Sequence, residues 1–204
     1  MDHSKVPVRE ECVVGALLHR WAKDKPDHPL FIFTDGTEWT FADTLKRTQA
    51  AAAGLRKLGV KQGDHVLCWM PNGPDAILTW FGANYLGAVF VPVNIAYRGG
   101  LLQHVLTLAQ AEVLVVHASL MPRLADVDTG AVKHIIVVGG APAALSRDYI
   151  IHDASALQGE GPAEPDRPVE PWHTIYVMFT SGTTGPSKAV VSTYIQVWSG
   201  ATMA

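Results

Sequence analysis

Two hydrophobic patterns follow one another along the chain. Short continuous apolar runs predict buried strands, at 30–33, 65–70, 88–91, 112–116, 134–138, 175–179 and 189–191. Apolar residues spaced three or four apart predict helices, at 11–25, 41–58, 74–86, 101–109 and 194–204, with a weaker one at 120–126. Strands and helices therefore alternate at short intervals. This order favours an α/β fold with a mostly parallel sheet flanked by helices on both faces.

Turn and cap residues add local detail to this pattern. Asp35-Gly36 lies between the apolar run 30–33 and the segment 38–40, which is typical of a β-hairpin. Thr40 is a good N-cap for the following helix, and Asp43 three residues later gives a partial capping box. By contrast, residues 155–172 contain four prolines and several acidic residues. We expect an exposed connector with little regular structure there.

Composition and charge narrow the class of protein. The 204 residues are 48% hydrophobic and 17% charged, as in ordinary soluble globular proteins. A net charge of -3 gives no electrostatic reason to expect a nucleic-acid partner. No apolar run approaches the length of a membrane helix, and no signal peptide is evident, so we expect a cytoplasmic protein with no integral membrane segment. Cys12 and Cys68 predict buried reduced thiols, and the nine histidines show no metal-ligand spacing, so no metal site is predicted.

The most informative stretch is a loop of small residues between the last two apolar runs. It reads Thr180, Ser181, Gly182, Thr183, Thr184, Gly185, Pro186, Ser187 and Lys188. Glycines let backbone N–H groups approach a phosphate chain closely, and hydroxyl groups add short donors to phosphate oxygens. A lysine at the end of the loop supplies a mobile positive charge. The loop is therefore predicted to hold a polyphosphate.

Two other interpretations of this loop are weaker. A Walker P-loop has four residues between its first glycine and the Gly-Lys pair, and a Ser or Thr after the lysine. Here Pro186 and Ser187 separate Gly185 from Lys188, and Ala189 follows. A flexible surface turn would be rich in small residues too, but it would not need a lysine at this place between two strands.

The stretch TSGTTGPSK after an apolar strand resembles the phosphate-binding signature of the adenylate-forming enzymes, which include acyl-CoA synthetases, peptide-synthetase adenylation domains and luciferases. Three further segments resemble the same family in the same order. They are 39–45, 63–72 and 86–94. The resemblance covers the chain from about Val13 to Met203. It identifies residues 1–204 as a partial AMP-binding domain of the acyl-CoA synthetase type.

The resemblance implies a reaction and a set of ligands. Family members activate a carboxylic acid with ATP and Mg²⁺ and pass the acyl group to a thiol, commonly coenzyme A. Carried onto this chain, Thr180–Lys188 would hold the β- and γ-phosphates, and Lys188 would assist the departure of pyrophosphate. Ala189 and Tyr194 stand where a glycine and a histidine are common. Tyr194 would then line the acyl site.

The resemblance also marks what this chain lacks. The family's adenine-binding segment, its presumed magnesium ligand, its ribose aspartate and its C-terminal lid domain would all follow Ala204. We therefore expect either the N-terminal portion of a ligase or an inactive fragment or pseudoenzyme that at most binds nucleotide phosphates. A sheet ending soon after the loop would leave apolar surface uncovered, so we expect low solubility when this chain is expressed alone.

Overall fold

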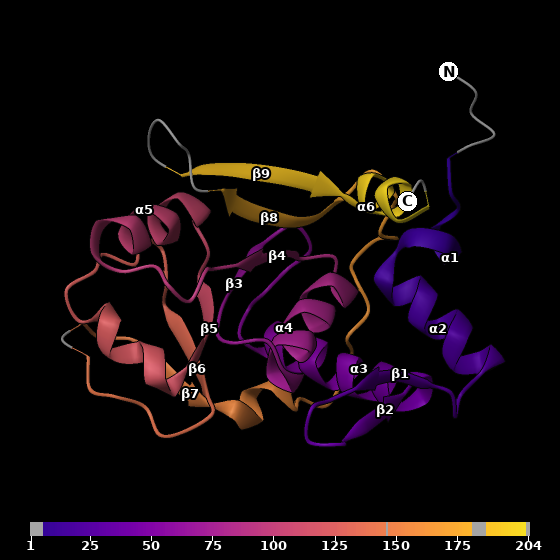
Figure 1. The fold of residues 1–204 in the computed structure, drawn as a ribbon, viewed down its shortest axis with the longest axis horizontal. Helices are drawn as coiled ribbons and strands as arrows, with labels where there is room; N and C mark the ends of the chain where they lie inside the picture. Colours follow the sequence, from indigo (N-terminus) through magenta and orange to yellow (C-terminus); the bar gives the residue numbers. More distant parts are fainter. Residues whose placement is uncertain (1–5, 146, 181–186, 203–204) are drawn as a thin grey trace.

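The computed structural model describes residues 6–145, 147–180 and 187–202. Its main sheet has the strand order β7-β6-β5-β3-β4-β8-β9 (Figure 1). The strands are β3 His65–Trp69, β4 Val89–Pro92, β5 Val113–His117, β6 His134–Val138, β7 Ile150–Asp153, β8 Thr174–Thr180 and β9 Lys188–Thr193. All neighbours pair in parallel except β8 and β9, which form an antiparallel hairpin at one edge. The mostly parallel sheet predicted from the sequence is confirmed.

Helices cover both faces of this sheet. The helices are α1 Arg9–Cys12, α2 Val14–Asp24, α3 Phe41–Lys57, α4 Pro74–Tyr85, α5 Gly99–Ala109 and α6 Tyr194–Thr202, with 3₁₀ helices η2 Ala118–Leu124 and η3 Ala154–Leu157. One cluster of buried side chains joins α5 and η2 to the sheet, and a second joins α3, α4 and η3 to the other face. Because both faces are buried, the central strands need apolar residues at every position, which explains their continuous apolar runs.

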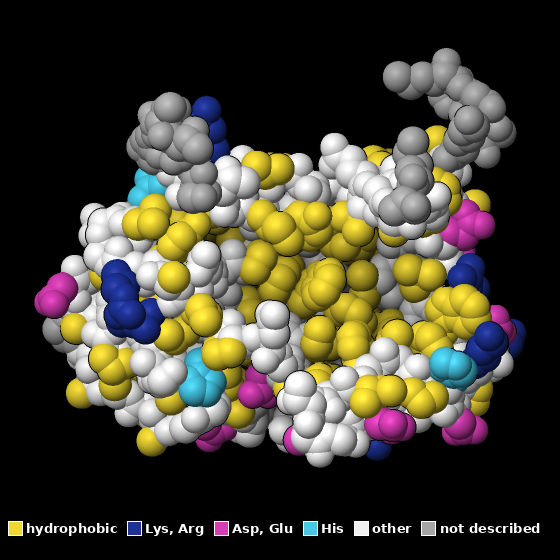
Figure 2. Space-filling model, viewed as in Figure 1, with side chains coloured by type: hydrophobic (Ala, Val, Ile, Leu, Met, Phe, Trp, Pro, Cys, Tyr) yellow, Lys and Arg dark blue, Asp and Glu magenta, His cyan; other side chains and the backbone are white. Residues whose placement is uncertain are grey.

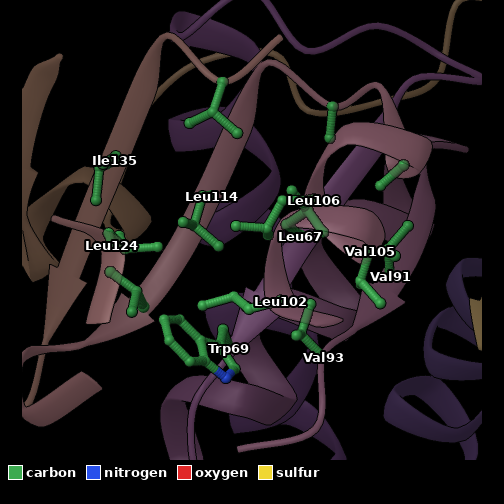
Figure 3. Packing of buried hydrophobic residues seen from close by; sticks show 14 of the residues in the cluster. Leu67, Trp69, Val91, Val93, Leu102, Val105, Leu106, Leu114, Leu124 and Ile135 are labelled. Atoms are coloured by element: carbon green, nitrogen blue, oxygen red, sulfur yellow. The ribbon is translucent and has the colours of Figure 1, made fainter. Parts of the chain in front are cut away.

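The core beneath α5 shows how this layer is packed (Figure 3). Leu102 and Leu106 of α5 point toward Leu67 and Leu114 on β3 and β5, and all four are fully buried. Trp69 lies at the end of β3, and its indole N–H donates to the carbonyl of Asn94 at 3.1 Å. This hydrogen bond satisfies the polar atom of a fully buried indole. Helix α5 is thus fixed on the sheet along its apolar side.

Local signals in the first third of the chain have the expected structure. A small two-stranded sheet forms from β1 Pro29–Ile32 and β2 Glu38–Thr40, and Gly36 at its tip has a positive φ of 84°. The N-cap of α3 is Thr40, whose hydroxyl oxygen accepts from the Asp43 amide at 3.1 Å, while the Asp43 carboxylate accepts from the Thr40 amide. The partial capping box predicted from the sequence is therefore complete.

Four sequence expectations need correction. The run 189–191, expected to form a buried strand, lies in the edge strand β9, where Val190 and Val191 are exposed. The helix expected over 11–25 is divided at Val13, whose backbone is extended, into α1 and α2. The weaker helix expected over 120–126 is the 3₁₀ helix η2, which contains Pro122. Strand β7 was not expected, because it is a short edge strand whose residues Ile150 and Ile151 are exposed, so it lacks the apolar run of a buried strand.

The segment 155–172 begins in η3 and has no other helix or strand. Four of its residues, Leu157, Ala163, Val169 and Pro171, are nevertheless buried. Gly159 donates its amide to the carbonyl of Ala50 on α3 at 2.9 Å. The segment has little regular structure, and its buried residues anchor it against the core at intervals.

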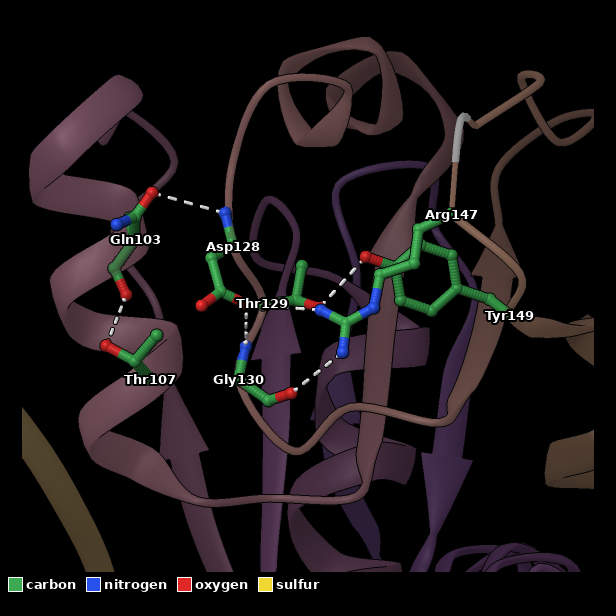
Figure 4. Close-up of polar contacts among 7 residues, drawn as sticks. All are labelled: Gln103, Thr107, Asp128, Thr129, Gly130, Arg147 and Tyr149. Carbon is green, nitrogen blue, oxygen red and sulfur yellow. Dashed lines mark hydrogen bonds and ion pairs between the residues drawn. The ribbon is translucent and has the colours of Figure 1, made fainter.

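A polar cluster ties the loop after η2 to the segment before β7 (Figure 4). Arg147 donates to the Asp128 carboxylate at 3.1 Å and to the carbonyl of Gly130 at 3.3 Å. Its guanidinium lies 5.7 Å from the centre of the Tyr149 ring. On the other side, the amide of Asp128 donates to the side chain of Gln103 on α5 at 3.2 Å. These contacts fix the loop at 128–130 between α5 and the approach to β7.

Candidate phosphate-binding site

The β8–β9 hairpin carries the predicted phosphate loop. Strand β8 ends at Thr180, and β9 begins at Lys188, and these two residues face each other as the last pair of the ladder. The Thr180 hydroxyl donates to the Lys188 carbonyl at 3.5 Å. Residues Ser181, Gly182, Thr183, Thr184, Gly185 and Pro186 lie outside the described residues. The described part shows that the loop leaves and re-enters the sheet at one point.

This point lies at the edge of the sheet where small molecules commonly bind. Strand β8 runs parallel to β4, with Phe90 opposite Tyr176. Its carboxyl end therefore lies at the same edge as the carboxyl ends of β3 and β4. In open α/β sheets, ligands bind outside the carboxyl ends of the strands. Thr180 and Lys188 are both exposed there, and no ion pair between described residues includes Lys188.

The carboxyl-terminal end of the loop is anchored to α5. Ser187 is buried, with 5% of its surface exposed. Its carbonyl oxygen accepts a hydrogen bond from His104 Nε2 at 2.9 Å. Nothing in the order of residues relates His104 to a loop 83 residues away. The structure therefore adds His104 as a side chain that contacts the end of the phosphate loop.

An apolar recess of about 740 Å³ is lined on one side by Tyr176 and Met178 of β8. Figure 2 shows it as a hollow lined by hydrophobic side chains near the centre of the view. Its walls include Trp80 of α4, Phe90 of β4 and Met178 of β8. Asn72 and Asn94 add polar groups, from the segments that follow β3 and β4. Such a surface fits an apolar group with a polar end.

Burial raises the pKa values of two groups near this recess. Cys68 lines it, and burial raises the pKa of the Cys68 thiol to about 12, despite a hydrogen bond with Thr79 that acts in the opposite direction. Cys68 therefore stays a neutral thiol and is a poor nucleophile. Burial also raises the pKa of the Asp75 carboxyl in the first turn of α4, and the charge of His117 partly offsets this.

Tyr194 lies apart from the phosphate loop. It follows β9, at the opposite end of the hairpin from Lys188. Its side chain is 1% exposed and packs with Cys12, Val169 and Ile175. The Tyr194 hydroxyl donates to the carbonyl of Asn84 at 3.4 Å. The structure thus does not bring Tyr194 together with Thr180 and Lys188, and its role in substrate binding stays a prediction.

The described residues can be compared with what the sequence suggested about cysteines, membrane helices and metal ligands. Cys12 and Cys68 are buried free thiols, as the sequence suggested. In residues 6–145, 147–180 and 187–202, no helix has the length and apolar character needed to cross a membrane. In the same residues, no three side chains of His, Cys, Asp or Glu form a group that could hold a metal ion.

Comparisons with known proteins agree with this fold. The family model described as AMP-binding enzyme matches residues 18–204. The chain is 31% identical over 185 residues to long-chain fatty acid transport protein 6 of Mus musculus, covering 86% of this chain and 29% of that protein. It is 26% identical over 156 residues to 4-coumarate:CoA ligase 1 of Petunia hybrida, covering 76% of this chain and 28% of that protein.

Solved structures with this fold include a long-chain-fatty-acid-CoA ligase of Archaeoglobus fulgidus, with a TM-score of 0.78 and 21% identity over 97% of this chain and 39% of that one. A fatty acyl CoA synthetase of Mycobacterium tuberculosis has a TM-score of 0.73 and 23% identity, over 92% of this chain and 36% of that one. The chain spans about three tenths of the length of the curated relatives named above. Because the family model covers nearly the whole chain, the chain belongs to the AMP-binding, adenylate-forming enzyme family.

Proposed function

We propose that this chain forms the phosphate-binding part of an ATP-dependent acid–thiol ligase. In this proposal the segment Thr180–Lys188 holds the β- and γ-phosphates of ATP. The observation that carries it is the position of Thr180 and Lys188, which pair at the carboxyl edge of a parallel sheet with both side chains exposed. A loop rich in glycine and hydroxyl residues joins them, and this composition suits a phosphate chain.

The proposed reaction is the activation of a carboxylic acid. A carboxylate oxygen forms a bond to the α-phosphorus of ATP while the bond from that phosphorus to pyrophosphate breaks. The acyl group then passes to the thiol of coenzyme A, and AMP leaves. Lys188 would neutralise charge on the departing pyrophosphate, since phosphoryl transfer depends mostly on positioning and electrostatic stabilisation. Mg²⁺ would share this neutralisation, and we expect its ligand outside this chain.

The apolar recess supports an acid with an apolar body. It runs beside Met178 of β8, two residues before Thr180, so an apolar group placed there would lie near the phosphate loop. The relatives named above are, by their names, a fatty acid transport protein and a 4-coumarate:CoA ligase. We therefore propose fatty or aromatic carboxylic acids as the substrate class, with the recess forming one wall of the acyl site.

Two measurements test this function. Isothermal titration calorimetry of the 204-residue chain with pyrophosphate tests the loop, and ATP–pyrophosphate exchange with fatty and aromatic acids tests catalysis. Lys188→Ala is expected to weaken pyrophosphate binding by about tenfold, as for the loss of one charge-assisted contact. Lys46→Ala, at an exposed lysine of α3, is the matched control and should bind as the wild type does. Equal affinity in all three proteins would contradict the proposed site.

The exchange assay separates catalysis from binding. Exchange that depends on an added acid and is lost in Lys188→Ala would support a catalytic chain. Pyrophosphate binding without exchange would instead support the alternative, a non-catalytic fragment or pseudoenzyme that binds nucleotide phosphates.

A further inference from the structure

Two histidines from neighbouring strands meet diagonally across the β6–β7 ladder, in which His134 lies opposite Ile150 and His152 lies opposite Ile136. His134 begins β6, and His152 is the third residue of β7, the edge strand. His134 Nδ1 and His152 Nε2 form a hydrogen bond at 3.1 Å, which a metal ion bound between them would replace. The two rings are stacked, with centres 5.3 Å apart and an angle of 26° between their planes. Both side chains are partly exposed, so the pair is accessible from solvent.

The separation of the two nitrogens suits a shared metal ion. An imidazole nitrogen binds Zn²⁺ at about 2.0–2.1 Å. Two such bonds that meet at an angle between 90° and the tetrahedral value place the nitrogens about 2.8–3.4 Å apart. The observed 3.1 Å lies inside this range. The ring torsion of histidine is broad, so a modest rotation of each ring can direct both lone pairs at one point between them.

We propose that His134 and His152 form a two-histidine site for a borderline divalent cation such as Zn²⁺, with water in the remaining coordination positions. Imidazole nitrogen suits Zn²⁺, Ni²⁺ and Cu²⁺, whereas Mg²⁺ prefers oxygen ligands. No third His, Cys, Asp or Glu side chain completes a ligand group among the described residues, so the protein would supply two ligands only. This site is separate from the phosphate loop and does not depend on the proposed function.

The surrounding charges are compatible with a bound cation. The hydrogen bond from Lys133 is the main cause that lowers the pKa of the carboxyl of Glu112, the residue before β5, and the charge of the nearby His134 adds to it. Asp153 follows His152 directly and acts on it electrostatically. Burial and the neighbouring His134 together lower the pKa of the His152 ring.

A cation at this pair would join the edge strand to the sheet. Among the described strands, β7 pairs only with β6, and four residue pairs form that ladder. A metal held by one side chain from each strand binds the folded chain and not the unfolded one. It therefore stabilises the folded chain as its concentration rises.

The test is a Zn²⁺ titration of the chelator-treated chain, followed by calorimetry and by thermal unfolding. All proteins carry His3→Ala, because a histidine at the third position next to a free amino terminus can chelate metal by itself. His134→Ala and His152→Ala are each expected to weaken Zn²⁺ binding by at least about tenfold, since each loses one arm of a chelate. His28→Ala, at an exposed histidine whose Nδ1 contacts the Pro29 carbonyl, should bind as the parent does.

Two further measurements distinguish the loss of the metal site from a loss of the fold. His152→Gln retains a polar side chain at the edge strand, and it should keep the far-ultraviolet circular dichroism of the parent while losing the Zn²⁺-dependent rise in Tm. With Cu²⁺, electron paramagnetic resonance should show two imidazole nitrogens in the parent and one in His152→Gln. Zn²⁺ affinity that is unchanged in His134→Ala, His152→Ala and His152→Gln would overturn the proposal.

Discussion

Gly54 on α3 lies where two backbone segments approach each other closely. A Cβ atom built at Gly54 would lie 1.9 Å from the carbonyl oxygen of Ala156 in η3, and 3.3 Å from Leu157 Cα. Real Cβ contacts are essentially never shorter than 3.0 Å, so the substitution Gly54→Ala requires η3 to move by about 1 Å. The neighbouring atoms are backbone atoms, which cannot rotate away as a flexible side chain could.

The magnitude follows from two opposing effects. Replacing glycine by alanine inside a helix usually stabilises it by about 1 kcal/mol. Displacing η3 disturbs the buried Leu157 and the hydrogen bond from Gly159 to Ala50, and such overpacking destabilises by about 1–3 kcal/mol, or more where backbone must move. We expect the clash to win and to lower the free energy of unfolding by about 1–2 kcal/mol. For a chain of this size, this lowers Tm by roughly 2–8 °C.

Thermal unfolding followed by circular dichroism measures this effect. Gly100→Ala is the matched control, since Gly100 also lies in a helix and a Cβ atom there meets nothing within 4 Å. The control is expected to keep or slightly raise Tm, because the propensity term acts there alone. The reasoning would be refuted if Gly54→Ala had the same Tm as Gly100→Ala. The close approach of α3 and η3 would then have no effect on the stability of the variant.

Three further predictions use other parts of the structure. His104→Leu removes the donor to the Ser187 carbonyl and is expected to weaken pyrophosphate binding by about threefold to tenfold, whereas His104→Gln, which retains an N–H donor, should recover most of it in calorimetry. Asn84→Ala removes two buried hydrogen bonds, to the carbonyls of Ala88 and Ile175, and should lower the urea-derived stability by about 2–4 kcal/mol, with unchanged stability counting against this account. The thiol of Cys68 ionises near its ordinary pKa of 9.0 when unfolded and near about 12 when folded, so the folded state keeps the proton longer and stability falls as pH rises from 9 toward 12. A Cys68→Ala variant should lose less stability over that range, by up to about 1.4 kcal/mol per pH unit. Parallel plots of the free energy of unfolding against pH for the two proteins would exclude the effect.

The sequence predicted most accurately the strands that are buried on both faces. Strand β6 was predicted at its observed bounds, because both of its faces are buried and its apolar run is therefore continuous. Strand β7 escaped prediction, because an edge strand with exposed Ile150 and Ile151 has neither a continuous run nor strict alternation. Strand β9 shows the opposite case, because its apolar run predicted a strand although Val190 and Val191 are exposed.

The sequence could not show contacts that depend on how segments are packed. His104 meets Ser187 only because α5 and the β8–β9 hairpin are packed beside each other, and these residues lie 83 positions apart. His134 and His152 meet because parallel pairing sets the register of β6 against β7. No spacing rule links either pair. The chemistry of the loop, in contrast, was visible in the order of its residues, since glycine, hydroxyl and lysine groups act there by local composition.

Ala189 shows how the structure bears on a departure from the family pattern. The resemblance placed a glycine after the lysine, and this chain has alanine there. Ala189 lies in β9, pairs with Phe179 across the antiparallel ladder and is exposed. No described glycine with positive φ occurs in β9, and an extended strand accommodates a Cβ atom without strain. The alanine therefore fits the strand that positions Lys188, and the departure gives no structural reason to doubt a phosphate-binding role for that lysine.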